Sequence, residues 1–328
     1  MTLRSLLLAC LLFASLRAAD AGPGWVSFGP SSGRKVVLLA GDEEYRSEES
    51  LPMLARLLAE RHGFRCTVLF SHDPDGTLNP NRAESLGNPV AIDEAELLVL
   101  GLRFRRWPDA TMARFDAAMT RGVPVVALRT STHAFQFKEG PYLKYNSFGP
   151  QVLGEGWRTH WGHHAVEATR SVVEPANAAH PILRGVGTIF ADTDVYEAYP
   201  PADATVLLRG HVLVGMKPTD SESTKVKKRQ TDGVEQPVNS PAMPVAWVRE
   251  LPRGAAIQRV FCTTMASASD LADASLRRLV VNGVFWGLGL EVPAKADVEP
   301  LTPYQPSRYA FNGFRKGQKA EQFLPAAR

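Results

Sequence analysis

The histidines of this sequence gather in one short segment. Three of the 8 lie between positions 160 and 164, namely His160, His163 and His164. Imidazoles this close together can exchange protons with a substrate, hydrogen-bond a sugar or bind a transition metal. A helix would place His160 and His164 on one face, but Gly162 argues against a helix, and the spacing matches no standard zinc signature.

The histidine segment therefore leaves three interpretations open. In the first, His163 and His164 act as general acid or base, and Trp157 and Trp161 stack on a sugar ring. In the second, His160 and His164 hold a divalent metal ion, the only cofactor that the sequence suggests. In the third, the histidines are ordinary loop residues.

A charged loop follows the first strongly apolar run of the chain, which ends at Gly41. Glu44 in this loop could serve as a general acid or base, or it could be a first-turn acid that favours a helix dipole. Other polar residues after predicted strands are expected to contact a ligand: Asp42, Tyr45, Arg46 and Arg103.

Residues 129–133 stand where amidotransferases and related hydrolases turn sharply from strand to helix and present a nucleophile. No cysteine occurs there. Thr130 could attack a substrate with His133 as its base, or its hydroxyl could cap a helix. Arg129 could orient an anionic or polyhydroxyl ligand, or form a structural salt bridge. Further along, Asp192 and Asp194 alternate on a strand-like piece, where Asp194 either completes the site or faces solvent.

The elements that must position these residues alternate between strands and helices. Apolar runs predict buried strands at 35–40, 66–70, 97–100 and 123–128, and amphipathic patterns predict helices at 50–62 and 109–121. This alternation predicts a three-layer α/β/α, flavodoxin-like fold with a mostly parallel sheet. Ligands collect at the carboxyl edge of such a sheet, where these loops meet.

The pattern becomes irregular between about 136 and 244, which predicts an elaborated insertion within an α/β domain of residues 34–292. Short strand-like pieces occur at 206–208 and 212–216, and residues 219–241 are polar enough to predict an exposed loop. Strands at 245–248 and 259–262 and a helix at 271–288 then close the core. Residues 293–328 are rich in proline and predict an extended tail over the domain surface.

The net charge, the lengths of the apolar runs and the first residues of the chain limit the kind of protein that this can be. A net charge of +3 over 328 residues predicts no nucleic-acid partner. Residues 1–21 have the layout of a signal peptide, with cleavage near Ala21, so we expect export to the periplasm or beyond; a lipoprotein anchored at Cys10 is the less favoured alternative. No later run reaches the length of a transmembrane span. Cys66 and Cys262 lie in apolar runs and are expected to be buried thiols.

The motifs taken in order resemble the ThuA-like (trehalose utilisation) family, in particular an exported branch found in planctomycete-type bacteria. The matching segments are residues 41–49, 128–135, 152–155, 160–164, 180–183, 244–247, 261–265, 304–306 and 311–314. The resemblance implies a class I glutamine amidotransferase-like fold and a role in the catabolism of trehalose or related sugars. Two departures limit it: Arg129 and Thr130 stand where amidotransferases place cysteine, and Met265-Ala266-Ser267 replaces a Gly-His that many ThuA-like proteins carry.

Three functions are consistent with these observations. The first is an exported enzyme that acts on a sugar or oxidised sugar by acid–base chemistry. The second is a carbohydrate-binding protein without catalytic activity, and the third is a metal-dependent hydrolase or lyase. A small carbohydrate is the expected ligand, and the sequence does not predict an oligomeric state.

Overall fold

Five parallel strands form the centre of the structure, a computed structural model that describes residues 19–325. Each strand is an almost continuous apolar run because helices cover both faces of the sheet. They are β3 (Lys35–Gly41), β4 (Arg65–Phe70), β5 (Leu97–Leu102), β6 (Val125–Leu128) and β13 (Ala256–Thr263).

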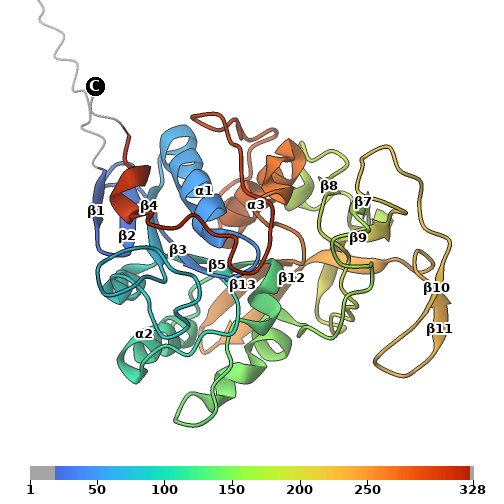
Figure 1. Cartoon of the computed structure of the whole chain (residues 1–328), viewed down its shortest axis with the longest axis horizontal. Coiled ribbons are helices and arrows are strands. Elements are labelled where there is room, and N and C mark those ends of the chain that lie inside the picture. The colour runs from blue at the N-terminus through green and yellow to red at the C-terminus, as the bar shows by residue number, and fades with distance from the viewer. Residues whose placement is uncertain (1–18, 326–328) are drawn as a thin grey trace, which may run out of the picture.

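Antiparallel strands extend this centre on both sides. On one side lie β1 (Asp20–Gly22) and β2 (Trp25–Phe28). On the other side lie β12 (Met243–Arg253), β9 (Thr205–Val212), β7 (Thr169–Val173) and β8 (Phe190–Ala191). The resulting sheet has 11 strands in the order β1-β2-β4-β3-β5-β6-β13-β12-β9-β7-β8 (Figure 1). The predicted α/β fold is thus confirmed.

Helices pack on both faces of the parallel strands and create two cores. The helices α1 (Ser47–His62) and α3 (Ala274–Gly287) cover one face, and α2 (Asp109–Thr120) lies on the other (Figure 1). Leu54 and Leu279 belong to the first core, whereas Phe115 and Trp247 belong to the second. This division produces the three layers expected from the alternation of strands and helices.

Short helical turns make up much of the remaining backbone. Most are 3₁₀ turns, and η4 is a π turn. They are η1 (Pro89–Glu94), η2 (Arg129–His133), η3 (Leu143–Ser147), η4 (Gly149–Leu153), η5 (Pro175–Asn177), η6 (Pro181–Leu183), η7 (Asp270–Ala272) and η8 (Ala320–Phe323).

Helix α1 begins earlier than its sequence pattern predicts. The pattern predicts a helix from residue 50, but the helix starts at Ser47, and Pro52 lies inside it. Arg46 precedes the helix in the left-handed region, with φ of 60°, and its carbonyl accepts the backbone N–H groups of Glu49 and Ser50. Backbone geometry therefore sets the start of the helix. The sequence gives no signal for it, because no side chain caps the helix there.

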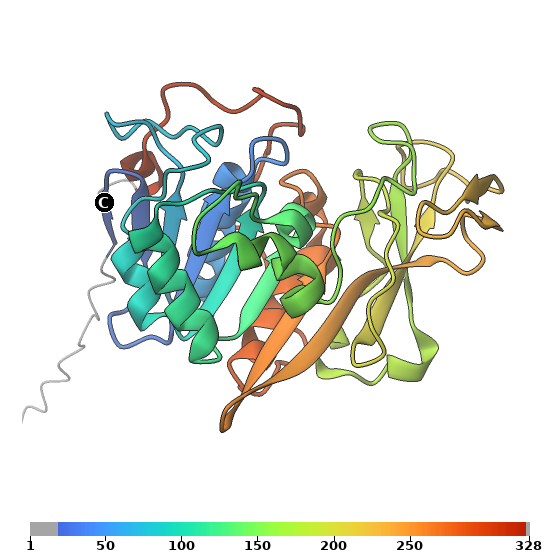
Figure 2. The same cartoon turned by 90° about the horizontal axis from the view of Figure 1, so that it is seen from below.

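The irregular insertion contains more regular structure than predicted. The piece expected at 206–208 lies within the longer strand β9, which ends at Val212, so the piece expected at 212–216 lies almost wholly outside a strand. The stretch expected to be an exposed loop contains a hairpin of β10 (Val226–Lys228) and β11 (Glu235–Pro237). The sequence pattern did not predict these strands, because strands this short and rich in charged residues have no alternating apolar pattern. Figure 2 shows the part of the insertion from β7 to β11 as a second lobe, into which the long strand β12 runs from the main sheet, whereas η3 and η4 pack against the main lobe.

The chain after α3 runs over the main lobe without long regular elements, ending in η8. Tyr309 and Phe314 anchor it, since each is less than a tenth exposed. None of the helices between residues 19 and 325 has both the length and the apolar character that a membrane crossing requires. Most of the expected signal peptide lies outside the described residues, and its expected cleavage point near Ala21 falls within β1.

Candidate functional site

Four loops meet at the carboxyl edge of the parallel strands, as the strand pattern predicts. The loop after β5 bonds to the loop after β6 through the N–H of Phe104 and the carbonyl of His133, 3.0 Å apart. The N–H of Arg129 donates to Met265 after β13, and the N–H of Ala268 donates to Tyr45 after β3, both at 3.0 Å. The backbone alone therefore brings these segments together.

Asp194, from the insertion, lies at the centre of this meeting point and is almost fully buried. Its carboxylate contacts Nδ1 of His160 at 2.7 Å and Nδ1 of His164 at 3.1 Å. Burial alone would raise the pKa of Asp194, but the hydrogen bonds of the two imidazoles and the charge of Arg129 lower it well below its ordinary value. Asp194 is thus an anion that holds two imidazoles.

His164 bridges two carboxylates. Its Nδ1 faces Asp194, and its Nε2 lies 3.3 Å from Oε1 of Glu44. These hydrogen bonds, to Asp194 first and then to Glu44, raise the pKa of His164 to about 9. His164 is therefore a cation at neutral pH, and a third of its side chain remains accessible. Glu44 and His164, each predicted separately as a general acid or base, are therefore in contact.

Arg129 lies beneath the histidines and does not reach a ligand. Its side chain is 2% exposed. One guanidinium nitrogen donates to the carbonyls of Asp194 and Thr264, at 2.8 and 2.6 Å, and the other lies 3.2 Å from the Asp194 carboxylate. The group also stacks over the rings of Tyr45 and Tyr196, at 4.7 and 4.0 Å from their centroids. The expectation that Arg129 orients a ligand is wrong, because its donors face protein atoms; the structural alternative holds.

Arg129 also has an unusual backbone. Its φ of 43° is in the left-handed region, which disfavours residues with a β-carbon. The sharp turn predicted after β6 is therefore present, but it holds a guanidinium inward where hydrolases of related architecture display a nucleophile. Thr130 donates to Asp42, and Ser131 donates to the carbonyl of Leu100 at 2.9 Å. Both hydroxyls are fully buried, so they act as structural bonds and not as nucleophiles.

Two further predicted ligand contacts are buried. Trp161 is 0% exposed, and its indole N–H donates to the carbonyl of Val238 at 2.9 Å, so it cannot stack on a ligand. Arg46 is also 0% exposed and donates to the carbonyls of Glu43, Glu44 and Ala310, so it fixes the loop after β3 to the tail. Both corrections have one cause: a polar tip does not keep a large side chain at the surface when backbone acceptors surround it.

The remaining predicted residues occupy mixed positions. Asp42 accepts the N–H groups of Glu44 and Tyr45, at 2.8 and 2.9 Å, and so shapes the loop. Tyr45 packs under His164 with ring centroids 6.3 Å apart. His163 is exposed, and its backbone N–H donates to Glu167. Of the three loop histidines, only His160 and His164 share the carboxylate.

An aromatic rim surrounds the histidines. It consists of Trp157, His133, Phe104 and Phe311, together with Arg103. The His133 ring lies 5.0 Å from Phe104 and 5.5 Å from Trp157. Burial, with the charges of Arg103 and Arg129, lowers the pKa of His133 well below its ordinary value, so its ring is neutral. Trp157 and Phe311 are 42% and 55% exposed and can meet a ligand.

Sequence reasoning missed two members of this rim. Phe104 is adjacent to the predicted Arg103, so a strand-end position was the available signal. Phe311 lies in the tail, far from the other loops in sequence. Only the packing of the tail brings it to Arg103, whose guanidinium carbon lies 5.0 Å from the centroid of the Phe311 ring.

The same cluster satisfies the basic requirement of a metal site. His160, His164 and Asp194 each offer one donor atom, and the three donor atoms lie within 4.8 Å of one another. His160 and His164 also border an open groove of about 400 Å³, which His163, Lys225 and Lys227 line as well. Two imidazoles and one carboxylate suit a divalent transition metal.

Solved structures with a similar fold include ThuA-like proteins. One from Parabacteroides merdae matches with a TM-score of 0.50 at 16% identity, over 80% of this chain and 92% of that chain. Another, from Bacteroides uniformis, gives 0.46 at 14% identity, over 78% and 92% of the two chains. The first likeness shows a common fold, in agreement with the resemblance in the motifs. No protein-family model and no curated protein matches the sequence.

We expect Arg129→Met to destabilise the fold strongly. The change leaves the Asp194 carboxylate buried without its guanidinium partner, which typically costs about 3–5 kcal/mol. Urea denaturation followed by circular dichroism measures this loss. The exposed pair of Arg114 and Asp93 offers a control, because Arg114→Met should cost at most about 1 kcal/mol. Recovery of stability in the double variant R129M/D194N would confirm the coupling, and an R129M variant as stable as wild type would contradict it.

Glu48, in the first turn of α1, should make stability depend on pH. Burial raises the pKa of its carboxyl to about 7, against which the Arg46 guanidinium, 3.3 Å away, acts only partly. The folded state therefore favours the protonated form, and this contribution is lost as pH rises from the unfolded value of 4.5 through 7. Glu48→Gln should gain stability relative to wild type between pH 5 and 8, by roughly 3 kcal/mol at most.

Denaturation of both proteins at each pH tests this expectation, since the difference cancels the other titrating groups. The exposed Glu139→Gln should show a difference that does not change with pH. An equally flat difference for Glu48→Gln would show that Glu48 is ionised throughout this range.

Proposed function

We propose that the chain is a ThuA-like protein that acts on a sugar or oxidised sugar by general acid–base chemistry. The observation that carries this proposal is the His164 bridge between Asp194 and Glu44, with His160 on the same carboxylate. The motifs of the ThuA-like family and the fold shared with a ThuA-like protein support the choice of a sugar.

The two imidazoles suit opposite proton transfers. His164 is cationic and accessible, so it can donate a proton to a substrate oxygen. His160 directs Nδ1 to Asp194, and no other polar contact engages its ring among the described residues. An imidazole whose Nδ1–H donates to a carboxylate exposes Nε2 as a base, the arrangement that orients histidine in hydrolase triads. The ring centroids are 4.7 Å apart, so one small substrate can meet both.

The aromatic rim supports binding of a sugar ring. Trp157 and Phe311 are exposed on either side of the rim and offer apolar faces, while Arg103 and Glu44 offer charged groups that hydroxyls can contact. Sugars combine apolar C–H faces with many hydroxyls, so this mixture matches their chemistry.

The reaction class that this site favours is proton transfer, as in an isomerase or lyase. The hydroxyls and thiols considered as nucleophiles are not available at this site, because Thr130 and Ser131 are bonded and buried and Cys66 and Cys262 are also buried. Burial raises the pKa of both thiols, so neither supplies a thiolate near neutral pH. We also propose export, on the basis of residues 1–21.

His164→Gln should abolish turnover of every sugar that the protein converts, because the amide keeps the shape but cannot carry the proton. His163→Gln is the matched control and should retain activity, since the Asp194 carboxylate holds His160 and His164 and not His163. Trehalose, glucose and their keto derivatives, incubated with each protein and followed by NMR, are the assay. The wild-type rate should fall as pH rises through about 9, where His164 loses its proton.

Two results would contradict acid–base catalysis at this site. Full turnover by H164Q would remove His164 from the mechanism. Saturable sugar binding to the wild type with no product after long incubation would instead favour a carbohydrate-binding protein without catalytic activity.

A metal-dependent hydrolase or lyase is the second candidate, favoured by the donor set of His160, His164 and Asp194. These three residues would hold the ion, which would supply Lewis-acid polarisation of a substrate oxygen. The contact of Arg129 with the same carboxylate, at 3.2 Å, would orient Asp194 toward the ion.

Elemental analysis of the purified protein decides between the two candidates. If this candidate holds, about one equivalent of metal should be present, His160→Ala and His164→Ala should each lose it, and His163→Ala should keep it. Full activity in protein that a chelator has freed of metal would exclude this candidate and leave the acid–base proposal intact.

A further inference from the structure

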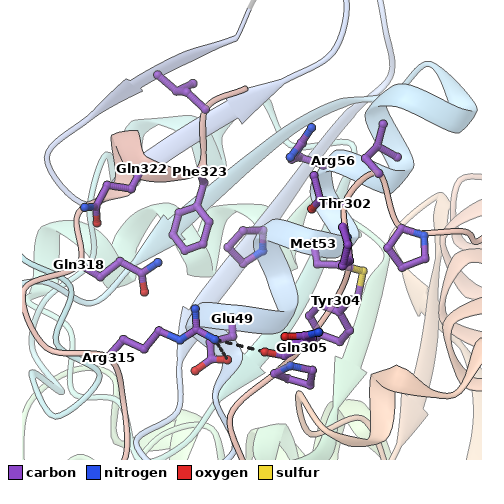
Figure 3. A pocket seen from close by; sticks show the side chains of 16 residues that line it. Glu49, Met53, Arg56, Thr302, Tyr304, Gln305, Arg315, Gln318, Gln322 and Phe323 are labelled. Atoms are coloured by element: carbon purple, nitrogen blue, oxygen red, sulfur yellow. Dashed lines mark hydrogen bonds and ion pairs between the residues drawn. The ribbon is translucent and has the colours of Figure 1, made fainter. Parts of the chain in front are cut away.

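A second pocket lies on the other side of the tail from the histidines, between α1 and the C-terminal segment. Its volume is about 400 Å³, within the range of small-molecule sites. None of the residues that line it belongs to the histidine cluster or the aromatic rim. Figure 3 shows Glu49 and Arg56 at opposite ends of this pocket, with Phe323 and Gln318 on one side and Met53 and Tyr304 on the other.

One face of α1 forms the floor of the pocket. Glu49, Met53 and Arg56 recur at intervals of four and three residues, so they lie in a row along the helix. Seven residues of helix rise about 10 Å along the axis. The backbone positions of Glu49 and Arg56 are therefore separated by about the length of a small sugar. The pocket is therefore polar at both ends and apolar between them.

Arg56 has no partner in the described part of the chain, where no hydrogen bond, ion pair or ring contact engages its guanidinium. Its Nε is buried from solvent without an acceptor, and burial lowers the pKa of the group. A guanidinium stays charged in proteins, so an anionic group delivered into the pocket would find an unmatched cation.

Glu49 differs from Arg56 because its charge is already matched. Its side chain is 7% exposed, and Oε2 accepts the N–H of Ser307 at 2.8 Å and lies 3.5 Å from Arg315. Its other oxygen, Oε1, is buried and has no hydrogen-bond donor. Glu49 therefore does not compete with a ligand for the Arg56 guanidinium.

The side walls suit a ligand with both hydroxyls and apolar faces. Gln305, Gln318, Gln322 and Thr302 provide amides and a hydroxyl, and the ring of Phe323 and several prolines provide flat apolar surfaces. Such a mixture of side chains can bind a sugar, because flat apolar surfaces stack on its C–H faces and amides bond its hydroxyls. The same two kinds of contact are proposed for the aromatic rim.

We propose that this pocket binds a sugar acid, with its carboxylate on Arg56 and its hydroxyls on the amides of Gln305, Gln318 and Gln322. The unmatched guanidinium selects the acid over a neutral sugar, and the amides and the Phe323 ring select a polyhydroxylated ring over a simple anion. This site is separate from the histidine site and does not depend on the function proposed there.

Isothermal titration calorimetry of the full chain with D-glucuronate and D-gluconate tests this proposal, with D-glucose and acetate as the neutral and simple-anion comparisons. Arg56→Gln should weaken binding of both acids roughly tenfold or more, because the charge-assisted bonds to the carboxylate are lost. Its melting temperature should not fall, since Arg56 makes no native bond. Arg61→Gln, on the same helix outside the pocket, and His164→Gln should bind the acids as the wild type does.

Several results would overturn the proposal. Absence of saturable binding of both acids to the wild type would do so, as would unchanged binding to R56Q. Acetate binding as tightly as glucuronate would show a simple anion site. Loss of binding in H164Q but not in R56Q would place the acid at the histidine site, which would remove this pocket and leave the proposed function standing.

Discussion

The buried ion pair between Arg129 and Asp194 holds the functional edge of the sheet together. Burying a guanidinium and a carboxylate is expensive unless further bonds surround them. Here the guanidinium also bonds the carbonyls of Asp194 and Thr264 and stacks on Tyr45 and Tyr196. These partners come from the loop after β3, the loop after β13 and the insertion, so a single side chain joins three distant parts of the chain.

This pair also explains why the histidines can function together. The hydrogen bonds of the two imidazoles, together with the charge of the guanidinium, keep Asp194 ionised in a buried position, and the anion in turn helps to keep His164 cationic. The strained turn at Arg129, which could have displayed a nucleophile, instead supplies the charge that organises the site.

The tail connects the histidine site with the second pocket. Ser307 bonds to Glu49 in the pocket, Tyr309 lies 5.5 Å from the His164 ring, and the N–H of Ala310 donates to the carbonyl of Glu44. These contacts occur within four residues of chain. An extended segment with few internal bonds can follow two surfaces at once, which a helix of the same length could not do.

The sequence sufficed for the layered fold and for the edge where the site forms, because buried parallel strands are continuous apolar runs and their carboxyl ends must share one side of the sheet. It also sufficed for Glu44 and His164 as candidates. It did not reveal that Asp194 is the centre of the cluster. It also did not reveal that Trp157 is exposed whereas Trp161 is buried, or that the donors of Arg129 bond buried protein atoms. Local patterns report which faces are apolar, whereas these roles depend on partners 30 or more residues away. Only the packing of the insertion and the tail against the sheet decides which polar side chains find buried partners and which remain free to meet a ligand.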